Sequence, residues 1–485
     1  MANLLAFDLG ASSGRAMLAE YSDGKIKMRE LHRFTNDPVT VCGTMYWDIL
    51  RLVFNIKKGI TEAVNAGGFD SVGIDTWGVD FGLIDGDGQL IGNPVHYRDK
   101  RTDDYKQFKV PFDEVYKSTG IQFMQINTLF QLDALLKNRP EEIETAKNML
   151  FTPDLLNYFL CGEMKTEYTM ASTSQMLDAQ KRDWDYSLID KAGIPRRLLG
   201  DIVKPGTVCG KLSVEIREEL GAPEAEVICI ASHDTASAVA AVPTEEDDFI
   251  YISSGTWSLL GTELKEPIIN EKALKYNFAN EGGVNNTIRF LKNIMGTWII
   301  AECRRQWARE GQEYGFGDLE QMARESAPFA SFIDVDHEDF IKPGNMPRRI
   351  KEHCQKSGQH IPETPGEVIR CVDESLALRY RQAIGQTEDC TGVDYKTVNI
   401  VGGGVKSALL CQMTANATGK TVTAGPDEAT VLGNIAIQLM ARGVLKDIKE
   451  VRRVIANSSE TIRYSPKDTD DWNAAYERYL KLTKG

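Results

Sequence analysis

The chain has 485 residues, of which 42% are hydrophobic and 26% charged, and its formal net charge at pH 7 is -14. This length exceeds what one hydrophobic core can organise, so we expect two or three globular domains. The acidic charge argues against an extended nucleic-acid or acidic-membrane surface, although a small anionic ligand can still be held locally. No apolar run approaches the roughly 18 residues of a membrane span and no leader-like start is present, so we expect a cytoplasmic protein without nucleic-acid or membrane partners.

The nine cysteines are spread singly along the chain, without a Cys-x-x-Cys pair or histidines at zinc spacing. This usage favours reduced, mostly buried thiols over a disulfide framework or a zinc site. Pairing of Cys354 with Cys371 remains open as a minority alternative.

The first segment, residues 4–21 (LLAFDLGASSGRAMLAEY), has an acid near the end of an apolar run, then a small polar turn and a second run. A dinucleotide-binding turn needs Gly-x-Gly-x-x-Gly followed by a helix, whereas this turn has only Gly10 and Gly14. A hairpin signal and another strand-like run follow at residues 22–32. The pattern therefore predicts a meander of three strands, with Asp8 directly before a hairpin rich in backbone N–H groups.

The same pattern returns in the second half of the chain, at residues 249–262 (FIYISSGTWSLLGT). The polar segment 243–248, which contains proline, precedes this second copy and has the composition of a domain boundary. An internal repeat of this size indicates two related modules. We therefore predict domains at residues 1–243 and 244–485.

Each half continues with short apolar runs and helical patterns in alternation. In the first half, strands are predicted at 71–75 and 227–231, and a helix from residue 234. In the second half, the predictions are a strand at 397–401, a turn at 402–404, a helix at 406–417, a strand at 421–423 and a helix at 428–442. Such alternation indicates mixed α/β layers. Two halves of this kind leave an interdomain cleft, to which each presents one hairpin of a size suited to phosphate.

The hairpins and four further blocks together resemble the FGGY carbohydrate kinases of the actin-like ATPase clan. These blocks are 71–81 (SVGIDTWGVDF), 231–239 (ASHDTASAV), 280–283 (NEGG) and 291–296 (LKNIMG). The resemblance extends from residue 3 to about residue 443. It implies two actin-like ATPase domains, which are ribonuclease H-like, with a duplicated phosphate-binding hairpin.

The resemblance also implies an activity, which is phosphoryl transfer from ATP to a sugar with Mg²⁺ as the cation. Within the family the blocks are most similar to those of kinases acting on the 1-hydroxyl of L-rhamnulose. A kinase for another ketose or polyol, such as fuculose, xylulose or ribulose, is the nearest alternative. A noncatalytic actin-clan ATPase with a protein partner is a more distant one. The sequence predicts no particular oligomeric state.

Phosphoryl transfer needs a cradle for the phosphates and a cation beside it. The first hairpin offers backbone N–H groups, hydroxyls and a guanidinium, and the second offers an opposing set. The residues concerned are Ala11, Ser12, Ser13, Gly14 and Arg15 in the first hairpin and Gly255 and Thr256 in the second. Each turn alone is also compatible with a simple tight hairpin, but the repetition favours phosphate binding. Asp8 is placed to hold Mg²⁺, most simply through water, or else to open the turn.

A base for the sugar hydroxyl is predicted at Asp234, which follows a buried strand and begins a helix. The resemblance puts the proton acceptor at this residue, while helix capping is the structural alternative. The helix N–H groups are expected to lower its pKa. A loose transition state still lets Asp234 orient the hydroxyl and accept its proton late. His233 and Thr235 are expected beside the sugar, or else as structural polar groups.

A sugar pocket needs polar partners for vicinal hydroxyls and an aromatic face for C–H groups. The resemblance places Gly78 and Asn293 at the substrate. The chemistry of Asp80 suggests that it also contacts the sugar, and Trp77 is either a contact or a core residue.

Adenosine is expected over the glycine run 402–404, with Gly403 at its centre, since glycines let the base and ribose approach the backbone. Two segments depart from the family's pattern. Residues 405–407 are Val-Lys-Ser where the family usually has Cys-Gln-Asn, and Ala301 replaces a glutamine that contacts the nucleotide. These changes concern the adenine contacts rather than the phosphate chemistry.

Overall fold

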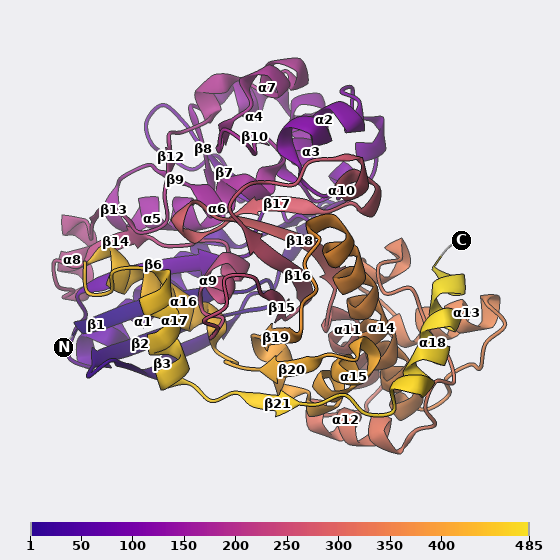
Figure 1. Cartoon of the computed structure of the whole chain (residues 1–485). Helices are drawn as coiled ribbons and strands as arrows, with labels where there is room; N and C mark the ends of the chain where they lie inside the picture. Colours follow the sequence, from indigo (N-terminus) through magenta and orange to yellow (C-terminus); the bar gives the residue numbers. More distant parts are fainter. Residues whose placement is uncertain (1, 484–485) are drawn as a thin grey trace. The chain divides into compact units, whose positions relative to one another are not determined.

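The computed structural model describes residues 2–483, which form two compact units (Figure 1). Unit 1 comprises the chain up to Glu245, Glu263–Phe290 and Ala429–Ser459, and unit 2 comprises Glu246–Thr262, Leu291–Glu428 and the chain from Glu460. The first change of unit therefore lies next to the predicted boundary at residue 243. The return of two later segments to unit 1 was not predicted.

Unit 1 is built on a six-stranded sheet of order β13-β14-β6-β1-β2-β3. Its strands are β1 (Ala2–Leu9), β2 (Ser13–Ser22), β3 (Lys25–Thr35), β6 (Ser71–Thr76), β13 (Thr207–Lys211) and β14 (Glu226–Cys229). Strands β1, β6 and β14 are parallel, and the other pairings are antiparallel. The predicted meander β1-β2-β3 is confirmed, and its second turn has φ values of 53° at Asp23 and 72° at Gly24, as a two-residue hairpin turn requires.

Unit 2 repeats this arrangement with β15 at its centre. Its strands are β15 (Ile250–Ser254), β16 (Trp257–Leu264), β18 (Ile288–Met295), β19 (Thr397–Val401), β20 (Thr421–Ala424) and β21 (Ile462–Tyr464). With β17 (Ala279–Gly282) at one edge they form a seven-stranded sheet of order β17-β18-β16-β15-β19-β20-β21. As in unit 1, a hairpin is followed by two parallel strands and an antiparallel edge strand. The duplication predicted from the two hairpins thus extends to the sheets.

Helices and short strands complete each unit. In unit 1 the helices are α1 (Ile49–Asn65), α2 (Phe112–Thr119), α3 (Thr128–Asn138), α4 (Pro140–Thr145), α5 (Thr152–Cys161), α6 (Tyr168–Ala171), α7 (Tyr186–Ala192), α8 (Val214–Leu220), α9 (Asp234–Ala240), α10 (Glu271–Tyr276), α16 (Ala429–Ala441) and α17 (Ile448–Ser458). In unit 2 they are α11 (Trp298–Arg309), α12 (Phe316–Glu325), α13 (Met346–Lys356), α14 (Pro365–Thr391), α15 (Ala408–Thr418) and α18 (Thr469–Leu482). The short strands of unit 1 are β4 (Val39–Val41), β5 (Thr44–Tyr46), β7 (Phe81–Ile84), β8 (Asn148–Phe151), β9 (Thr166–Glu167), β10 (Leu177–Asp178), β11 (Asp183–Trp184), β12 (Ile202–Val203) and β17 (Ala279–Gly282).

Two predicted absences concern membranes and disulfides. No helix among residues 2–483 has the length and apolarity needed to cross a bilayer. Within the same residues the cysteines are free thiols, Cys354 and Cys371 included. The side chains of these two lie close enough that each influences the pKa of the other, and the pKa of the Cys371 thiol is raised.

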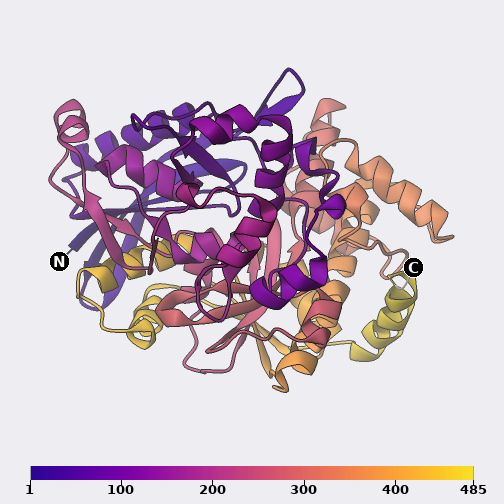
Figure 2. The same cartoon turned by 90° about the horizontal axis from the view of Figure 1, so that it is seen from above.

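Helix α16 is the clearest departure from the predicted domain organisation, because it packs against β1, β6 and α9 of unit 1. In Figure 2 this golden segment runs beside the indigo N-terminal strands. Gly433 lies so close to α9 that a Cβ there would be 1.9 Å from the carbonyl oxygen of Ser237. Gln438 bonds to the Ser71 hydroxyl at 2.7 Å and donates to the Leu5 carbonyl at 3.0 Å. A late segment of the chain therefore completes the interior of unit 1.

Candidate functional site

Three acidic residues of unit 1 lie at or just beyond the carboxyl ends of adjacent parallel strands. Asp8 of β1 lies in register with Asp75 of β6. Thr76 then forms a parallel bridge with His233, which puts Asp234 at the start of α9 on the same edge. Ligands of open α/β sheets bind at this edge. The structure thus brings together the two predicted carboxylates, Asp8 and Asp234, and adds Asp75.

Asp75 was missed by the sequence analysis and is fully buried. Its Oδ2 accepts a hydrogen bond from Asn434 Nδ2 at 2.6 Å, while its Oδ1 is buried without a partner among the described residues. Burial raises the pKa of Asp75 well above its ordinary value, and the nearby charge of Asp8 raises it further. The apolar run ending in an acid at residues 71–75 resembles the one before Asp8 and was the available signal, but nothing in the sequence indicated Asn434.

Asp8 is bound to the first hairpin through Arg15, its cross-strand partner. The guanidinium donates to Asp8 Oδ2 from Nε at 3.1 Å and from Nη2 at 2.8 Å, and both side chains are 16% exposed. The turn itself is closed by the Gly10 N–H, which donates to the Ser13 carbonyl at 2.9 Å. Gly14 is required by packing, because a Cβ there would be 2.3 Å from the Phe34 ring.

Asp234 has a different electrostatic environment from the one predicted. Its Oδ1 accepts from the Thr235 N–H at 2.6 Å and the Thr235 hydroxyl at 3.2 Å, and 33% of its side chain remains exposed. Its pKa is raised by loss of hydration and by Asp8, which together outweigh the lowering by His233 and by the Thr235 bonds. The prediction of a lowered pKa is therefore wrong. His233, rather than Asp234, occupies the capping position of α9.

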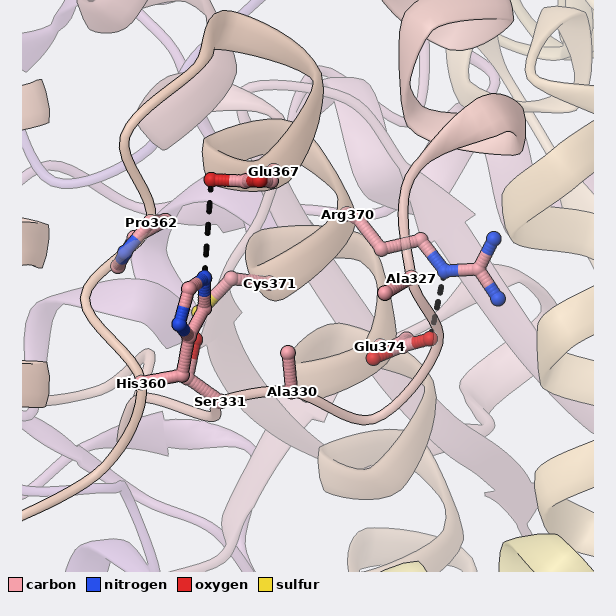
Figure 3. Close-up of a pocket in the computed structure, with 9 residues that line it drawn as sticks. All are labelled: Ala327, Ala330, Ser331, His360, Pro362, Glu367, Arg370, Cys371 and Glu374. Atoms are coloured by element: carbon pink, nitrogen blue, oxygen red, sulfur yellow. Dashed lines mark hydrogen bonds and ion pairs between the residues drawn. The ribbon is translucent and has the colours of Figure 1, made fainter.

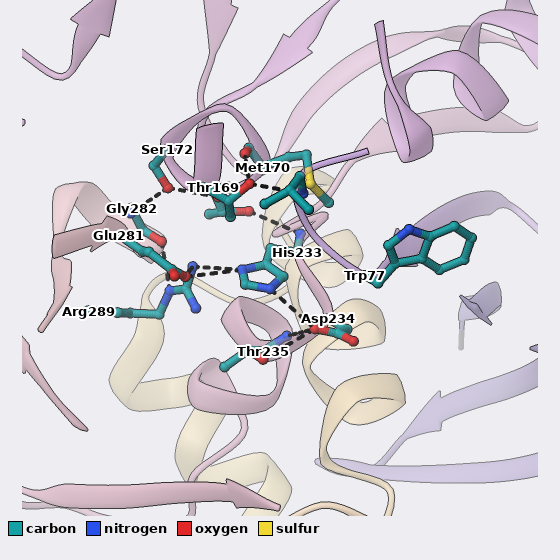
Figure 4. A network of polar contacts seen from close by, with 12 residues as sticks. Trp77, Thr169, Met170, Ser172, His233, Asp234, Thr235, Glu281, Gly282 and Arg289 are labelled. Carbon is teal, nitrogen blue, oxygen red and sulfur yellow. Dashed lines mark hydrogen bonds and ion pairs between the residues drawn. The ribbon is translucent and has the colours of Figure 1, made fainter. Parts of the chain in front are cut away.

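A buried network holds the His233 imidazole between two carboxylates (Figure 4). Nε2 lies 3.5 Å from Asp234 Oδ1, and Nδ1 lies 3.3 Å from Glu281 Oε2. Arg289, which has no exposed surface, places Nη2 3.1 Å from His233 Nδ1 and 3.0 Å from Glu281 Oε2. Neither Glu281 nor Arg289 was predicted. The network fixes the imidazole beside Asp234 from the opposite side.

Gly78 also lies beside this imidazole. A Cβ on Gly78 would be 3.4 Å from His233 Nε2 and 3.3 Å from Thr173 Cγ2. The next residue, Val79, has φ of 69°, which is strained for a β-branched side chain. Thr173 and Thr128 hold this conformation by bonding to the Val79 N–H at 3.2 Å and to its carbonyl at 2.6 Å.

Asp80, predicted to contact the sugar, and Trp77, predicted as a contact or a core residue, both lie inside unit 1. The carboxylate of Asp80 is fully buried and accepts from the indole N–H groups of Trp47 at 2.5 Å and Trp77 at 3.0 Å. Gln131 and the Tyr97 N–H also donate to it, at 3.0 Å and 3.2 Å. Burial raises the pKa of Asp80 to about 6. Trp77 is 6% exposed and directs its indole away from His233 in Figure 4. The hydrogen bond between Trp77 and Asp80 therefore stabilises the strained turn at Val79 from the interior of unit 1.

In unit 2 the second hairpin is held by the turn after β18, the strand that carries Asn293. The Thr297 N–H and hydroxyl donate to the Gly255 carbonyl at 3.0 Å and 2.8 Å, and the Gly296 N–H donates to the Thr256 carbonyl at 3.2 Å. A Cβ on Gly296 would be 2.6 Å from the Gly255 oxygen. The two hairpins therefore differ in their turns, because four residues separate the paired Leu9 and Gly14 in the first and three separate Ser254 and Ser258 in the second, and they are stabilised by different neighbours.

The glycine run of unit 2 combines a packed and an open position. A Cβ on Gly404 would be 1.9 Å from Ser254 Oγ, whereas a Cβ on Gly403 would have no neighbour within 4 Å. Packing thus explains Gly404 but not Gly403. Ser407, at a position where the sequence departs from the family's pattern, caps α15 by accepting from the Leu410 N–H at 3.2 Å. Serine and asparagine cap helices equally well, so this departure preserves the local structure.

Two pockets in the described part of the chain lie away from the residues discussed so far. The one beside α14 in Figure 3 has a volume of about 10 Å³, space for a single water molecule. A shallower hollow of about 390 Å³ in unit 1 is lined by residues that include Arg182 and Trp184. Neither contains a predicted site residue.

With this geometry established, comparison with known proteins assigns the class. Residues 3–241 match the N-terminal domain of the FGGY family of carbohydrate kinases, and residues 250–442 match its C-terminal domain. The chain belongs to the FGGY family of carbohydrate kinases and is a sugar kinase.

The chain is also similar to individual proteins over nearly its whole length. The chain is 42% identical to a rhamnulokinase of Bacteroides thetaiotaomicron, covering 99% of each protein, and 44% identical to a rhamnulokinase of Oceanobacillus iheyensis, covering 95% of this chain and 98% of the relative. Among solved structures, a xylulose kinase from Lactobacillus acidophilus superposes with a TM-score of 0.81 at 16% identity, covering 100% of this chain and 98% of the other. A glycerol kinase from Plasmodium falciparum with ADP gives 0.76 at 14% identity, covering 99% and 98%. These structures share the two-domain actin-like ATPase fold.

Proposed function

We propose that the protein transfers the γ-phosphoryl group of ATP to the 1-hydroxyl of L-rhamnulose, giving L-rhamnulose 1-phosphate and ADP in rhamnose catabolism. The observation that carries this proposal is the identity of 42–44% to two rhamnulokinases over at least 95% of the chain. Since the reaction consumes ATP, we assign it to the cytoplasm.

Asp234 is the proposed proton acceptor. As the sugar oxygen forms its bond to the γ-phosphorus, the bond to the β,γ-bridging oxygen breaks and ADP leaves, while the hydroxyl proton passes to the Asp234 carboxylate and later to solvent. A general base works best when its pKa lies near the working pH, so the raised pKa of Asp234 suits this role. His233 and Thr235 position the carboxylate, and Gly78 lets the sugar approach them.

Asp8 and Asp75 are proposed to hold Mg²⁺. Both offer carboxylate oxygens, the ligands that Mg²⁺ prefers, and the partnerless Oδ1 of buried Asp75 fits a hydrated cation. When bound, Mg²⁺ supplies positive charge to the phosphoryl group in transfer. Arg15 keeps Asp8 oriented for this purpose.

The remaining predicted residues are assigned by unit. In unit 1, the hairpin residues Ala11, Ser12, Ser13, Gly14 and Arg15 are proposed to bind phosphate. In unit 2, Gly255 and Thr256 bind phosphate, Gly403 lies under adenosine, and Asn293 binds the sugar. Asp80 and Trp77 support the sugar-binding turn through the Asp80 carboxylate.

The test is ADP release by the purified protein with Mg²⁺ and ATP, across L-rhamnulose, L-fuculose, D-xylulose, L-ribulose and glycerol. We expect a kcat/KM for L-rhamnulose at least tenfold above that for the other sugars. A preference for a different sugar would contradict the assignment of L-rhamnulose as the substrate, but not the assignment of phosphoryl transfer as the reaction. Asp234→Asn should retain ATP binding and lose 100-fold or more of kcat, of the order expected for a general base. The surface variant Asp190→Asn is the matched control, since the Asp190 side chain pairs with Arg196 alone among residues 2–483.

A further inference from the structure

Three side chains of metal-ligating type gather on unit 2, outside the residues used above. His337 precedes the short 3₁₀ helix η6 (Glu338–Phe340), Asp339 lies within it, and His353 lies in the last turn of α13. Asp339 Oδ2 is 2.8 Å from His353 Nε2 and 3.5 Å from His337 Nδ1. One ligand atom from each of the three residues lies within 4.8 Å of the other two.

These separations suit a small tetrahedral ion. Zn²⁺ bonds of about 2.0–2.2 Å at tetrahedral angles place neighbouring ligand atoms roughly 3.4 Å apart. The distance from His337 to Asp339 already has this value, at 3.5 Å. The distance from His353 to Asp339 must open by about 0.6 Å, and the Asp339 side chain, 48% exposed, has the freedom to do so.

The local bonds also prepare the ligands. His337 Nδ1 accepts the Asp339 N–H at 3.2 Å, so this nitrogen carries a lone pair of the kind that binds metals, and the ion would take that lone pair over from the N–H. The two imidazoles are nearly perpendicular, at 73°, with centroids 4.5 Å apart. Buried Phe340 packs 4.7 Å from the His353 ring and restrains it. Arg349 Nη1 donates to the Asp339 carbonyl at 3.0 Å, which fixes η6 on α13.

We propose that His337, Asp339 and His353 bind a divalent transition-metal ion of the Zn²⁺ class, with water in the fourth position. The ion would replace two hydrogen bonds, the one between His353 and Asp339, whose proton passes to solvent, and the one from the Asp339 N–H to His337 Nδ1. It would join η6 to α13 directly. Asp336, the residue before His337, accepts from the Met295 N–H at 3.0 Å and from Arg379 Nε at 2.7 Å, so the ion also braces the segment that holds the end of β18.

In the experiment, the full-length protein is titrated with Co²⁺ and, separately, with Zn²⁺, each in a buffer that contains excess Mg²⁺. Visible absorption measures Co²⁺ binding, and the change in Tm measures the effect of Zn²⁺. Because second-shell changes cost about 10- to 100-fold in metal affinity, losing a ligand should weaken binding by more than tenfold. We expect this of both His337→Ala and His353→Ala. His360→Ala is the matched control, since His360 is 51% exposed in the same unit and its one ion pair in the described part of the chain is with Glu367, at 3.7 Å.

Thiols elsewhere in the chain also bind these metals, so the decisive quantity is the difference between each variant and the wild type. Equal Co²⁺ binding by wild type and His337→Ala would overturn the proposal, as would a Zn²⁺-induced Tm shift that survives this substitution. If His353→Ala loses structure because its ring packs on Phe340, His337→Ala still decides, since His337 is 42% exposed.

Discussion

Asp8 and Asp75 lie directly opposite each other on neighbouring parallel strands. Adjacent strands are about 4.8 Å apart, so side chains in register on the same face are close neighbours. Two carboxylates at this spacing repel each other, which contributes to the raised pKa of Asp75. A cation between them would relieve that repulsion.

Asp75→Asn should stabilise the metal-free protein while weakening its response to Mg²⁺. A carboxyl group with a raised folded pKa stabilises the fold below its unfolded pKa, and this contribution is lost as pH rises. At pH 7 the substitution should therefore raise Tm by a few degrees, since 1 kcal/mol corresponds to about 2–4 °C in a domain of this size. The Mg²⁺ concentration for half-maximal activity should increase. Thermal denaturation with EDTA and a Mg²⁺ titration check both effects, and a lower Tm with an unchanged titration would contradict them.

His233→Gln should move the acidic limb of the kcat/KM profile to higher pH. The charge of His233 lowers the pKa of Asp234, so its removal leaves loss of hydration and Asp8 to raise that pKa further. A pH profile of kcat/KM against the wild type measures the displacement. His360→Gln, on the surface of unit 2, should leave the profile unchanged. If the limb stays in place or moves to lower pH in His233→Gln, the limb does not report Asp234.

Gly433→Ala should destabilise the protein by about 1–3 kcal/mol, the usual cost of overpacking. The added methyl group would meet the Ser237 carbonyl of α9, the helix that starts with Asp234, so kcat should fall as well. Gly385→Ala is the matched control, because a Cβ on Gly385, within α14, has no neighbour within 4 Å. That change should stabilise by about 0.5–1 kcal/mol through helix propensity. Denaturant titration measures the free energy of unfolding of both variants. Equal changes in Gly433→Ala and Gly385→Ala would contradict the close packing of Gly433 against α9.

Gly403→Ala should leave Tm unchanged and raise the KM for ATP severalfold. The protein has space for the methyl group, so only a ligand close to the backbone would be affected. Gly404→Ala provides the contrast, since its Cβ would overlap Ser254 Oγ and lower Tm directly. An unchanged KM for ATP in Gly403→Ala would contradict the proposal that adenosine binds over Gly403.

Short sequence patterns predicted those elements whose conformation depends on residues close to one another in the chain. The two hairpins, the strands after them and the helix starting at Asp234 all depend on apolar periodicity and turn residues, which are read within about ten positions. Asn434 and Gln438 were not predictable in this way, because their partners Asp75 and Ser71 lie more than 350 positions earlier. The pKa of Asp234 was predicted in the wrong direction for the same reason. The helix N–H groups are visible in the sequence, whereas burial and Asp8 are not.

The return of α16 to unit 1 also has a consequence for synthesis on the ribosome. Strands β1 and β6 emerge early, but the side chains that bond to them from α16 arrive only after about 430 residues have been made, which takes roughly 20–90 s at about 5–20 residues per second. Until then Asp75 lacks its Asn434 donor, and the Leu5 carbonyl lacks Gln438. The nascent N-terminal half therefore cannot complete its interior alone, and chains that stop before α16 should be substrates for chaperones or proteases rather than half-active kinases.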